Sequence, residues 1–484
     1  KLPKPYNSFS FELSKSPDKK GSKVIIHFCH DVKPWIKKSD YYSVWKHNLK
    51  RADLIRINKP KIGKPVMTDF QMNIEYSLSK ERIKIIIDRF LGFIGTILNK
   101  YFPKIYLISK KYKNKKPYRV CFWTPTFQSD ILSFCRYLGN HPDYDVVVVL
   151  ENPAGFKKEP VQLLLPVKAK FLDKDHRSTI IKVKLFRPHV TIVDGHLPPV
   201  RLARKLFVLW HGFGWRFDNF GGEFFYAHNA ITKACGSGKK PNPNFIWQCF
   251  GPEDLKYRRD VSGFAEENLR MLGSAQSDDI LNTKLDKEQV RAFYSIDIMN
   301  KPTVLLAFTW YHGKVFAQWG DDTKLFKELF AFAEDIGINL IVRMHDKFRY
   351  SDDYLEHLER LIENYDHVMF KFKNQDRDNL LDILVSDVMV SNFSSILNQF
   401  YFTEKPSIHI YPGVKHIWKL DPERNNGGLL VYSFEELKKA IKMATENPDC
   451  CKEKSRAFNK ENITNVNGRT CERIERELRA LINR

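Results

Sequence analysis

A histidine stands between an apolar run and a pair of glycines in the segment "VLWHGFGWRFDN", residues 208–219. Such a run is typical of a buried parallel strand, and a glycine directly after the histidine is typical of a turn. His211 and Gly212 are therefore predicted to follow the end of a strand. Because an imidazole titrates near neutral pH, His211 is a candidate general base, and the alternative is a polar residue that only closes the strand.

The segment "RMHD", residues 343–346, places a second set of polar side chains at the end of another apolar run. Residues two apart in a strand share a face, so Arg343 and His345 are expected on the same side. An arginine can hold a phosphate through two parallel hydrogen bonds, and a neighbouring histidine can donate to another oxygen. The pair is a candidate phosphate site, and the alternative is a surface pair without a ligand.

The segment "SNFSSILNQF", residues 391–400, predicts a helix that begins at Ser394 or Ser395 directly after a strand. The free N–H groups of a helix start, the positive end of its dipole and two hydroxyls together favour an anion. The alternative is that Ser394 only caps the helix. A fourth cluster, Thr309 and Trp310 in "TWYHG", follows a further predicted strand.

The elements that must position these clusters are indicated by short apolar runs that alternate with longer amphipathic ones from residue 116 onward. Parallel sheets covered by helices have this pattern, and they bind ligands where their strands end. Strands are predicted in a first set at residues 118–125, 144–152, 188–196 and 205–212, and in a second set at 302–310, 338–345, 367–372, 387–391 and 406–412. Helices are predicted at 129–141, 323–336, 352–364 and 470–484.

The expected fold class is α/β, with two doubly wound, Rossmann-like units in tandem. A chain of 484 residues is long enough for two cores. We place the units at residues 116–275 and 276–484, with the last helix crossing back to the first unit. Residues 1–115 form an N-terminal extension with one strand candidate, "KVIIHFCHD".

The charge balance points to an anionic partner. Lysine plus arginine minus aspartate plus glutamate is 79 − 57 = +22, which favours a phosphate-rich substrate, an acidic lipid surface or nucleic acid. The basic residues are spread along the chain and no RNA-binding motif with stacking aromatics is present, so no nucleic acid partner is expected. The eight cysteines include no CxxC pair, which favours neither a zinc site nor a disulfide framework and predicts a reducing cytoplasm.

One apolar segment, "RIKIIIDRFLGFIGTILNKYFP" at residues 82–103, has its apolar residues at helical spacing. Charged residues inside it make it a poor membrane span. A basic run, "KKYKNKK" at 110–116, follows it. The segment predicts either a helix on an anionic membrane surface or a helix that packs on a domain.

Five motifs in this order resemble those of the CDP-glycerol glycerophosphotransferases of teichoic acid and capsule synthesis, which are built on the GT-B fold. "VLWHGFG" is similar to the family's "WHG", "LLAFTWYHG" to "YAPTWR", and "VRMHD" to "RxHP". "SDVMVSNFSSILNQF" is similar to "DxxxTDYSSxxFDF", and "GGLLVYSFEELKKAI" to the closing "GP…EL". The resemblance runs from about residue 200 to about residue 445.

The resemblance implies transfer of glycerol phosphate, or of a related polyol phosphate, from a CDP-linked donor to a hydroxyl of a membrane-anchored polymer. It implies no cofactor and no essential protein-bound metal, and a place at the inner face of the cell membrane. The first Rossmann-like unit would take the acceptor and the second the nucleotide. His211 and His345 would be catalytic, with His211 as general base. The implied donor-binding residues are Gly212, Thr309, Trp310, Arg343, Asp387, Ser391, Asn392, Ser394 and Ser395.

The sequence departs from the family's pattern in four places. Asn392 and Asn398 stand where the family has aspartates, and Asp346 stands where it has a proline. "GSAQSDD" replaces "GxPRND", which removes an arginine. These departures leave open another CDP-polyol as donor, a GT-B glycosyltransferase that uses a nucleotide sugar, and a lost activity. The charge of +22 leaves open a non-catalytic binding protein for RNA or another anionic polymer.

Overall fold

The computed structural model describes residues 8–9, 26–27, 80–101, 116–210, 221–308, 316, 319–344, 350, 352–373, 375–392, 394–411 and 426–484. The chain divides into two compact units, Lys1–Phe93 with Asn219–Glu223, and Ile94–Asp218 with Phe224–Arg484. In the smaller unit, β1 (Ser8–Phe9) pairs in parallel with β2 (Ile26–His27), which lies inside the predicted strand "KVIIHFCHD".

The predicted helix at 82–103 is confirmed as α4 (Lys80–Tyr101). Its apolar residues are divided between two faces. One face is exposed to solvent and carries the large apolar side chains of Ile86, Ile87, Phe90, Phe93 and Ile97.

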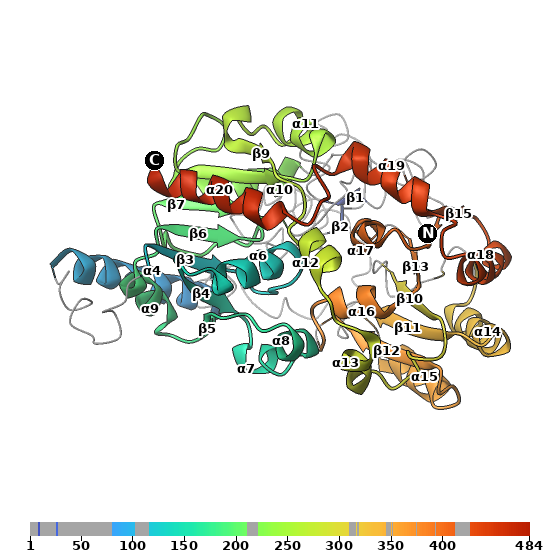
Figure 1. Ribbon diagram of the computed structural model, residues 1–484. Helices are drawn as coiled ribbons and strands as arrows, with labels where there is room; N and C mark the ends of the chain where they lie inside the picture. The colour runs from blue at the N-terminus through green and yellow to red at the C-terminus, as the bar shows by residue number, and fades with distance from the viewer. Residues whose placement is uncertain are drawn as a thin grey trace, which may run out of the picture. The chain divides into compact units, whose positions relative to one another are not determined.

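The larger unit contains a seven-stranded parallel sheet with the order β5-β4-β3-β6-β7-β8-β9 (Figure 1). Its strands are β3 (Tyr118–Trp123), β4 (Tyr144–Leu150), β5 (Lys170–Asp173), β6 (Val190–Val193), β7 (Lys205–Val208), β8 (Phe245–Cys249) and β9 (Leu269–Met271). The valine run of β4 is typical of such a strand, because β-branched side chains pack well in a sheet that is buried on both faces.

The same unit contains a six-stranded parallel sheet with the order β12-β11-β10-β13-β14-β15. Its strands are β10 (Thr303–Ala307), β11 (Asn339–Met344), β12 (Val368–Phe372), β13 (Val388–Ser391), β14 (Ser407–Ile410) and β15 (Leu429–Val431). In both sheets the first strand lies centrally, the next two extend to one side, and the later strands extend to the other. This is the doubly wound order, and the predicted fold class is confirmed.

Helices cover the sheets and connect their strands. Those that accompany the first sheet are α6 (Ser129–Asn140), α7 (Pro153–Phe156), α8 (Pro160–Leu164), α9 (Thr179–Phe186), α10 (Gly221–Cys235), α11 (Pro252–Asp260), η4 (Glu266–Asn268) and α12 (Gln276–Asn282). Those that follow in the chain are α13 (Lys287–Val290), η5 (Arg291–Phe293), α14 (Asp322–Asp335), α15 (Asp352–Ile362), α16 (Leu380–Val385), α17 (Ile396–Phe400), η7 (Tyr401–Thr403), α18 (Phe434–Glu446), α19 (Lys452–Asn462) and α20 (Thr470–Asn483).

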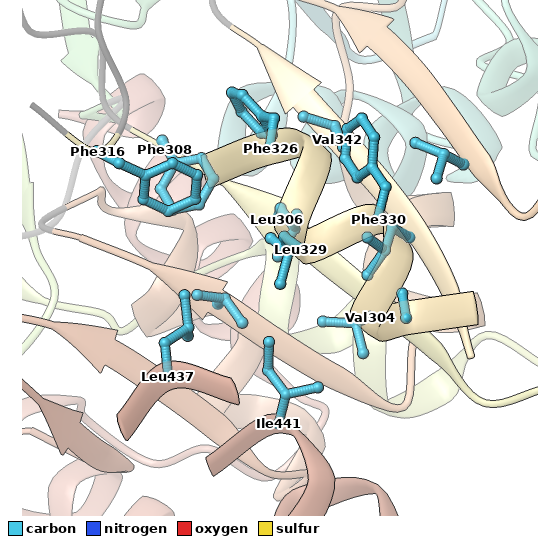
Figure 2. Packing of buried hydrophobic residues seen from close by; sticks show 14 of the residues in the cluster. Val304, Leu306, Phe308, Phe316, Phe326, Leu329, Phe330, Val342, Leu437 and Ile441 are labelled. Atoms are coloured by element: carbon cyan, nitrogen blue, oxygen red, sulfur yellow. The ribbon is translucent and has the colours of Figure 1, made fainter. Parts of the chain in front are cut away.

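The core of the second sheet forms where alternate strand residues meet α14 and α18 (Figure 2). Val304 and Leu306 on β10 are fully buried against Phe330 of α14 and Leu437 of α18, among other apolar residues. Burying a side chain of this size stabilises the folded protein by about 1.5–3 kcal/mol. The cluster therefore holds in place the strands whose ends carry the polar residues. The opposite faces of the same strands carry the polar residues described below.

The nine predicted strands of the two sheets are confirmed, although each is shorter than its apolar run. The strands β5, β8, β9 and β15 were not among the predicted ones. The last helix, α20, makes hydrogen bonds to the first sheet: Tyr144 Oη donates to Glu475 at 2.6 Å, and Lys205 Nζ donates to the Ile482 carbonyl at 2.6 Å. The residue at which one Rossmann-like unit ends and the next begins stays a prediction.

Candidate active site

Each sheet has a switch point, where consecutive crossovers leave in opposite directions and open a crevice at the carboxyl ends of the strands. In the first sheet it lies between β3 and β6, and in the second between β10 and β13. We call the side on which the strands end the carboxyl edge, and the opposite side the amino edge. Ligands of doubly wound sheets bind at the carboxyl edge.

At the carboxyl edge of the second sheet, three neighbouring strands end at the same level. Arg343 on β11 is paired with Ala307 on β10. Ser391, the last residue of β13, donates a hydrogen bond from its hydroxyl to the Ala307 carbonyl at 2.6 Å. The structure therefore brings together two predicted site residues, Arg343 and Ser391, and the buried Asn392 follows directly.

The guanidinium of Arg343 is held by protein groups. Its Nη1 lies 2.7 Å from Oδ2 of Asp382 on α16, and its Nη2 donates to the Asp376 carbonyl at 2.6 Å. Asp382 also accepts hydrogen bonds from Lys371 Nζ and from Tyr294 Oη, each at 2.7 Å. The Arg343 side chain is only 7% exposed, so its immediate partner is a buried carboxylate.

The charges in this cluster stabilise one another. Burial alone would raise the pKa of the Asp382 carboxyl, but Lys371 and Arg343 together hold that pKa below its ordinary value. For Arg343, burial acts to lower the pKa, and the carboxylates of Asp382 and Asp376 raise it above its usual range. Arg343 and Asp382 therefore stay ionised at neutral pH, and their ion pair fixes the end of β11, from which the chain continues to His345.

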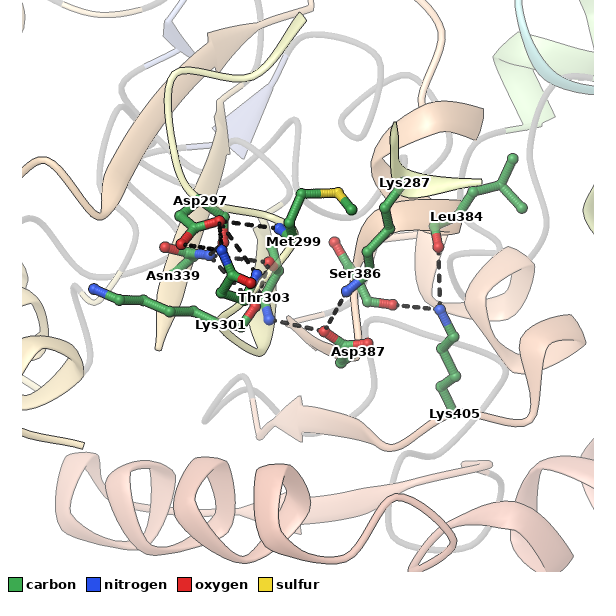
Figure 3. Close-up of polar contacts among 11 residues, drawn as sticks. Lys287, Asp297, Met299, Lys301, Thr303, Asn339, Leu384, Ser386, Asp387 and Lys405 are labelled. Atoms are coloured by element: carbon green, nitrogen blue, oxygen red, sulfur yellow. Dashed lines mark hydrogen bonds and ion pairs between the residues drawn. The ribbon is translucent and has the colours of Figure 1, made fainter. Parts of the chain in front are cut away.

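Asp387 lies at the amino edge, at the opposite end of the strands from Arg343 and Ser391. Figure 3 shows it beside Thr303 and Lys287. It precedes β13, and its Oδ2 accepts a hydrogen bond from the backbone N–H of Thr303, the first residue of β10, at 2.9 Å. Lys287 Nζ lies 3.2 Å from the same oxygen. Asp387 therefore has a structural partner at the start of β10. The nucleotide was expected at the opposite end of the strands, so this geometry does not support a place for Asp387 beside it.

The predicted helix after β13 is present as α17, with Ser395 as its N-cap residue. The Ser395 side chain makes no capping hydrogen bond, and Ser394 and Ser395 are both partly exposed. Capping alone therefore does not account for Ser395. Asn398 lies within α17, where its backbone N–H donates to the Ser395 carbonyl at 3.1 Å.

At the carboxyl edge of the first sheet, a carboxylate lies across the switch point. Asp194 directly follows β6, and its Oδ2 accepts a hydrogen bond from the Thr124 hydroxyl, directly after β3, at 2.7 Å. Its Oδ1 lies 2.8 Å from Nδ1 of His196. Both residues lie at the end of the predicted strand 188–196, and neither was among the predicted site residues. The signal that could have found them is a carboxylate and a histidine two residues apart directly after a buried strand.

The strand that leads to His211 is held firmly. The Leu209 N–H donates to the Val193 carbonyl at 2.8 Å, which continues the pairing of β7 with β6 beyond Val208. Trp210 is buried, and its ring centroid lies 5.2 Å from that of Trp247. The guanidinium of Arg258 lies 4.8 Å from the Trp210 ring centroid. The approach to His211 is therefore fixed up to the preceding residue.

Five predicted site residues lie outside the described residues: His211, Gly212, Thr309, Trp310 and His345. In the sequence, each lies one or two residues after a described residue: Trp210, Phe308 or Met344.

A polar network connects α6 to the second sheet. The Ser129 N–H donates to Asp378 Oδ2 at 3.0 Å, and Gln399 of α17 donates to the Ser129 hydroxyl at 3.2 Å. Gln276, in the segment where an arginine was expected, donates to Asn379 at 2.8 Å. Ser129 has a φ of +54°, a strained value for a residue other than glycine. The network anchors this strained start of α6 beside α17.

A cavity of about 720 Å³ lies elsewhere, between α6, α12 and the start of α20. Its lining includes Arg136, His141, Asp279 and Glu472, and none of the predicted site residues. Within the described ranges, no helix is long and apolar enough to cross a membrane.

Comparison with known proteins gives a family and a fold. The sequence profile of the family described as CDP-Glycerol:Poly(glycerophosphate) glycerophosphotransferase matches residues 257–479. The wall teichoic acid polymerase TagF is a similar solved structure, with 15% identity and a TM-score of 0.58, over 83% of this chain and 98% of that chain. A TagF variant soaked with CDPG is similar at 14% identity and a TM-score of 0.58, with the same coverage. No curated protein sequence matches this chain.

At such identities the likeness to TagF shows the fold, which is GT-B as expected from the motifs. The family profile spans the whole second sheet, including Arg343, Ser391 and the start of α17, and leaves out β3 to β8 of the first sheet. Its match agrees with the motifs that first indicated the family. Over residues 257–479 the chain is similar to the CDP-Glycerol:Poly(glycerophosphate) glycerophosphotransferase family, a family of transferases.

Proposed function

We propose that this protein transfers glycerol phosphate from CDP-glycerol to a hydroxyl of a growing polymer of the teichoic acid class. The observation that carries the proposal is the family match across the second sheet, which includes the polar residues of its carboxyl edge. In the reaction, the acceptor oxygen bonds to the phosphorus of glycerol phosphate, the bond from that phosphorus to the bridging oxygen breaks, and CMP leaves. The proton of the hydroxyl passes to a base.

His211 is the base in this proposal. A hydroxyl is a weak nucleophile at neutral pH, and an imidazole with a pKa near 6.5 can accept its proton as the new bond forms. The described strand end supports the assignment, because β7 and Trp210 are fixed by β6, Trp247 and Arg258 directly before His211.

The donor's phosphates are assigned to the carboxyl edge of the second sheet. Ser394 and Ser395 are partly exposed at the start of α17, where hydroxyls and backbone N–H groups favour an anion. His345 follows the end of β11 in sequence and is proposed to donate to the pyrophosphate. Arg343 is a positioning residue, because its ion pair with Asp382 holds the strand end from which His345 extends.

The acceptor is proposed to be anchored in a membrane on whose surface the protein lies. The exposed face of α4 supports this, since Phe90 is 61% and Phe93 62% exposed. An apolar face of this kind beside a basic run is typical of a helix that lies in the interface of an anionic membrane. The "KKYKNKK" run, residues 110–116, begins nine residues after the end of α4 in the sequence.

A ligand screen by thermal unfolding tests the donor. A ligand that binds only the folded protein stabilises it by about 2.7 kcal/mol at a hundred times its Kd, so its binding raises the midpoint. CDP-glycerol is expected to raise the midpoint more than CMP does. The screen also contains CDP-ribitol and UDP-sugars, because Asn392 and "GSAQSDD" depart from the family's pattern. A response to a UDP-sugar alone would replace this proposal with a glycosyltransferase.

A further inference from the structure

The cavity of about 720 Å³ between α6, α12 and the start of α20 has no part in the proposed reaction, and we call it the α6 cavity. Its α6 residues are those from Ser133 to Asn140, in the part of the helix that leads back to β4. Because a crossover helix returns the chain to the amino edge, this part lies away from the switch point where α6 begins. The volume is within the usual range of small-molecule sites, about 300–1,000 Å³.

Three side chains of the cavity lining present oxygen acceptors whose orientation is fixed by the protein. Asp279 is bonded through Oδ2 to Nη1 of Arg136. Asn140 donates from Nδ2 to the Arg136 carbonyl at 3.1 Å, and Asn282 donates from Nδ2 to the Gly468 carbonyl at 2.8 Å. Each amide nitrogen is thus held by the backbone, which leaves the two amide oxygens and Asp279 Oδ1 without a donor among the described residues.

The lining also presents two donors and two aromatic rings. Tyr137 on α6 and His141, directly after the helix, have ring centroids 6.2 Å apart, and both residues are partly exposed. His141 Nδ1 accepts a hydrogen bond from the Asp143 N–H at 3.2 Å, so the ring hydrogen is on Nε2. Within the described part of the chain, neither this Nε2 nor the Tyr137 hydroxyl has a hydrogen-bond partner.

The charges of the lining disfavour an anion. Its carboxylates are Asp278, Asp279 and Glu472, its cations are Arg136 and Lys284, and the guanidinium is already bonded to Asp279. Nη2 of Arg136 is buried without a partner in the described ranges, and such an unpaired donor is uncommon in a folded protein. A hydroxyl group both donates and accepts, so a neutral compound with several hydroxyls fits this lining better than a phosphate does.

We propose that the α6 cavity binds a neutral sugar. The hydroxyls of a sugar ring match the fixed oxygens of Asp279, Asn140 and Asn282 and the donor groups of Tyr137 and His141, and its C–H face matches the aromatic rings. An acyclic polyol has no such face. Since the cavity lies away from both switch points, its ligand does not compete with CDP-glycerol. The inference therefore does not depend on the proposed function.

The test is calorimetric titration of the full-length protein with methyl glycosides of glucose, galactose and N-acetylglucosamine. A ligand of this size is expected to bind with a Kd of about 1 mM. Glycerol phosphate is the anionic comparison, and it is expected to bind at least tenfold more weakly in the presence of CMP, which occupies the nucleotide site. Binding by a methyl glycoside is expected for a sugar unit within a chain, whereas binding by the free sugars alone assigns the cavity to a free sugar.

Two asparagine variants localise the binding. Asn140→Ala removes one of the fixed oxygens and is expected to weaken glycoside binding about fivefold, since one hydrogen bond is lost. Asn364→Ala is the matched control, because Asn364 is also exposed after a helix and donates to the carbonyl four residues earlier, that of Arg360, at 3.2 Å. It does not line the cavity, and it is expected to bind like the parent protein. Thermal unfolding checks that both variants are folded.

Tyr137→Phe is a third variant, which keeps the ring and removes the hydroxyl, and it is also expected to weaken binding about fivefold. The inference is overturned if the folded parent protein binds no sugar of the panel, free or as its methyl glycoside, or if Asn140→Ala and Tyr137→Phe both bind like Asn364→Ala. Displacement of the sugar by CMP would also overturn it, because the sugar would then lie in the nucleotide site. No step of the test requires turnover, so a protein that transfers nothing from CDP-glycerol can still confirm the sugar site.

Discussion

The two switch points differ in how their polar groups are used. In the first sheet, buried Asp194 is bonded to Thr124 across the switch point and orients a half-exposed imidazole. In the second sheet, Ser391 is fully buried and donates to Ala307 across the switch point, while the nearby Arg343 is bonded to Asp382. The same strand order thus carries a half-exposed histidine on a buried carboxylate in one sheet and a buried ion cluster in the other.

The two arrangements differ in how much stability the protein loses when one side chain is replaced. A buried charge that loses its partner costs several kcal/mol, so Arg343 and Asp382 are tied to stability. When His196 is replaced, Asp194 keeps its hydrogen bonds from Thr124 and from the backbone N–H of residue 196, so a smaller loss of stability is expected there. Four variants, one of them a double substitution, test this contrast.

The largest effect is expected at the end of β7 in the first sheet. His211→Ala is predicted to lower kcat by about 100- to 10,000-fold, because a general base contributes that much to proton transfer. The midpoint of thermal unfolding is expected to stay unchanged. The control is His357→Ala, an exposed histidine on α15. Turnover at the parent rate in purified His211→Ala would remove the base from the mechanism.

The second effect is a loss of stability in the second sheet. Arg343→Met leaves the buried Asp382 without its guanidinium partner, and we expect the free energy of unfolding to fall by about 3–5 kcal/mol in urea denaturation. Arg343→Lys keeps the charge and is expected to lose less. If Arg343→Met unfolds like the parent protein and only binds CDP-glycerol more weakly, Arg343 contacts the donor directly, as the motif comparison implied.

The third effect concerns the start of α17. Replacing Ser394 and Ser395 by alanine is predicted to raise the Kd of CDP-glycerol about tenfold, since hydrogen bonds to a charged phosphate are lost. Stability is expected to stay constant, because the Ser395 side chain does not cap the helix. Ser433→Ala is the control: Ser433 caps α18 by accepting from the Glu436 N–H, so its loss lowers stability by about 1 kcal/mol and spares donor binding. The opposite pattern would make α17 a purely structural helix.

The effect that is smallest at neutral pH is a pH dependence of stability at β14. His409 is paired with Ser391, and burial lowers its pKa to about 4. Because this pKa is below the unfolded value of about 6.5, its contribution to stability is present above pH 6.5 and is lost as the pH falls towards 4. His409→Phe is predicted to reduce this acid sensitivity, by at most about 3 kcal/mol at pH 4. Equal pH profiles of unfolding for the two proteins would contradict the assignment.

Most of the fold could be predicted from the sequence, because parallel strands that are buried on both faces are continuous apolar runs. The valines of β4 are such a run. The short strands β5 (Lys170–Asp173) and β15 (Leu429–Val431) could not be found in this way, since β5 has only two apolar residues between charged ones and β15 is only three residues long. Their places depend on pairing with a neighbouring strand.

The candidate site could be predicted less completely. The end of β13 and the start of α17 were located correctly, because both depend on local sequence. The partner of Arg343 could not be predicted, since Asp382 is 39 residues away and meets it only when α16 packs on the sheet. Asp387 was placed near the nucleotide from its motif alone, and the strand direction puts it at the amino edge beside Thr303.

The measurement that tests the central claim most directly follows two labels in one reaction. The purified protein is incubated with a glycerol phosphate oligomer and CDP-glycerol that carries one label in glycerol and another in cytidine. We expect the glycerol label to enter the oligomer while the cytidine label is released as CMP, and we expect His211→Ala to abolish both. If the oligomer gains no glycerol label from CDP-glycerol but gains a sugar label from a nucleotide sugar, transfer of glycerol phosphate is contradicted.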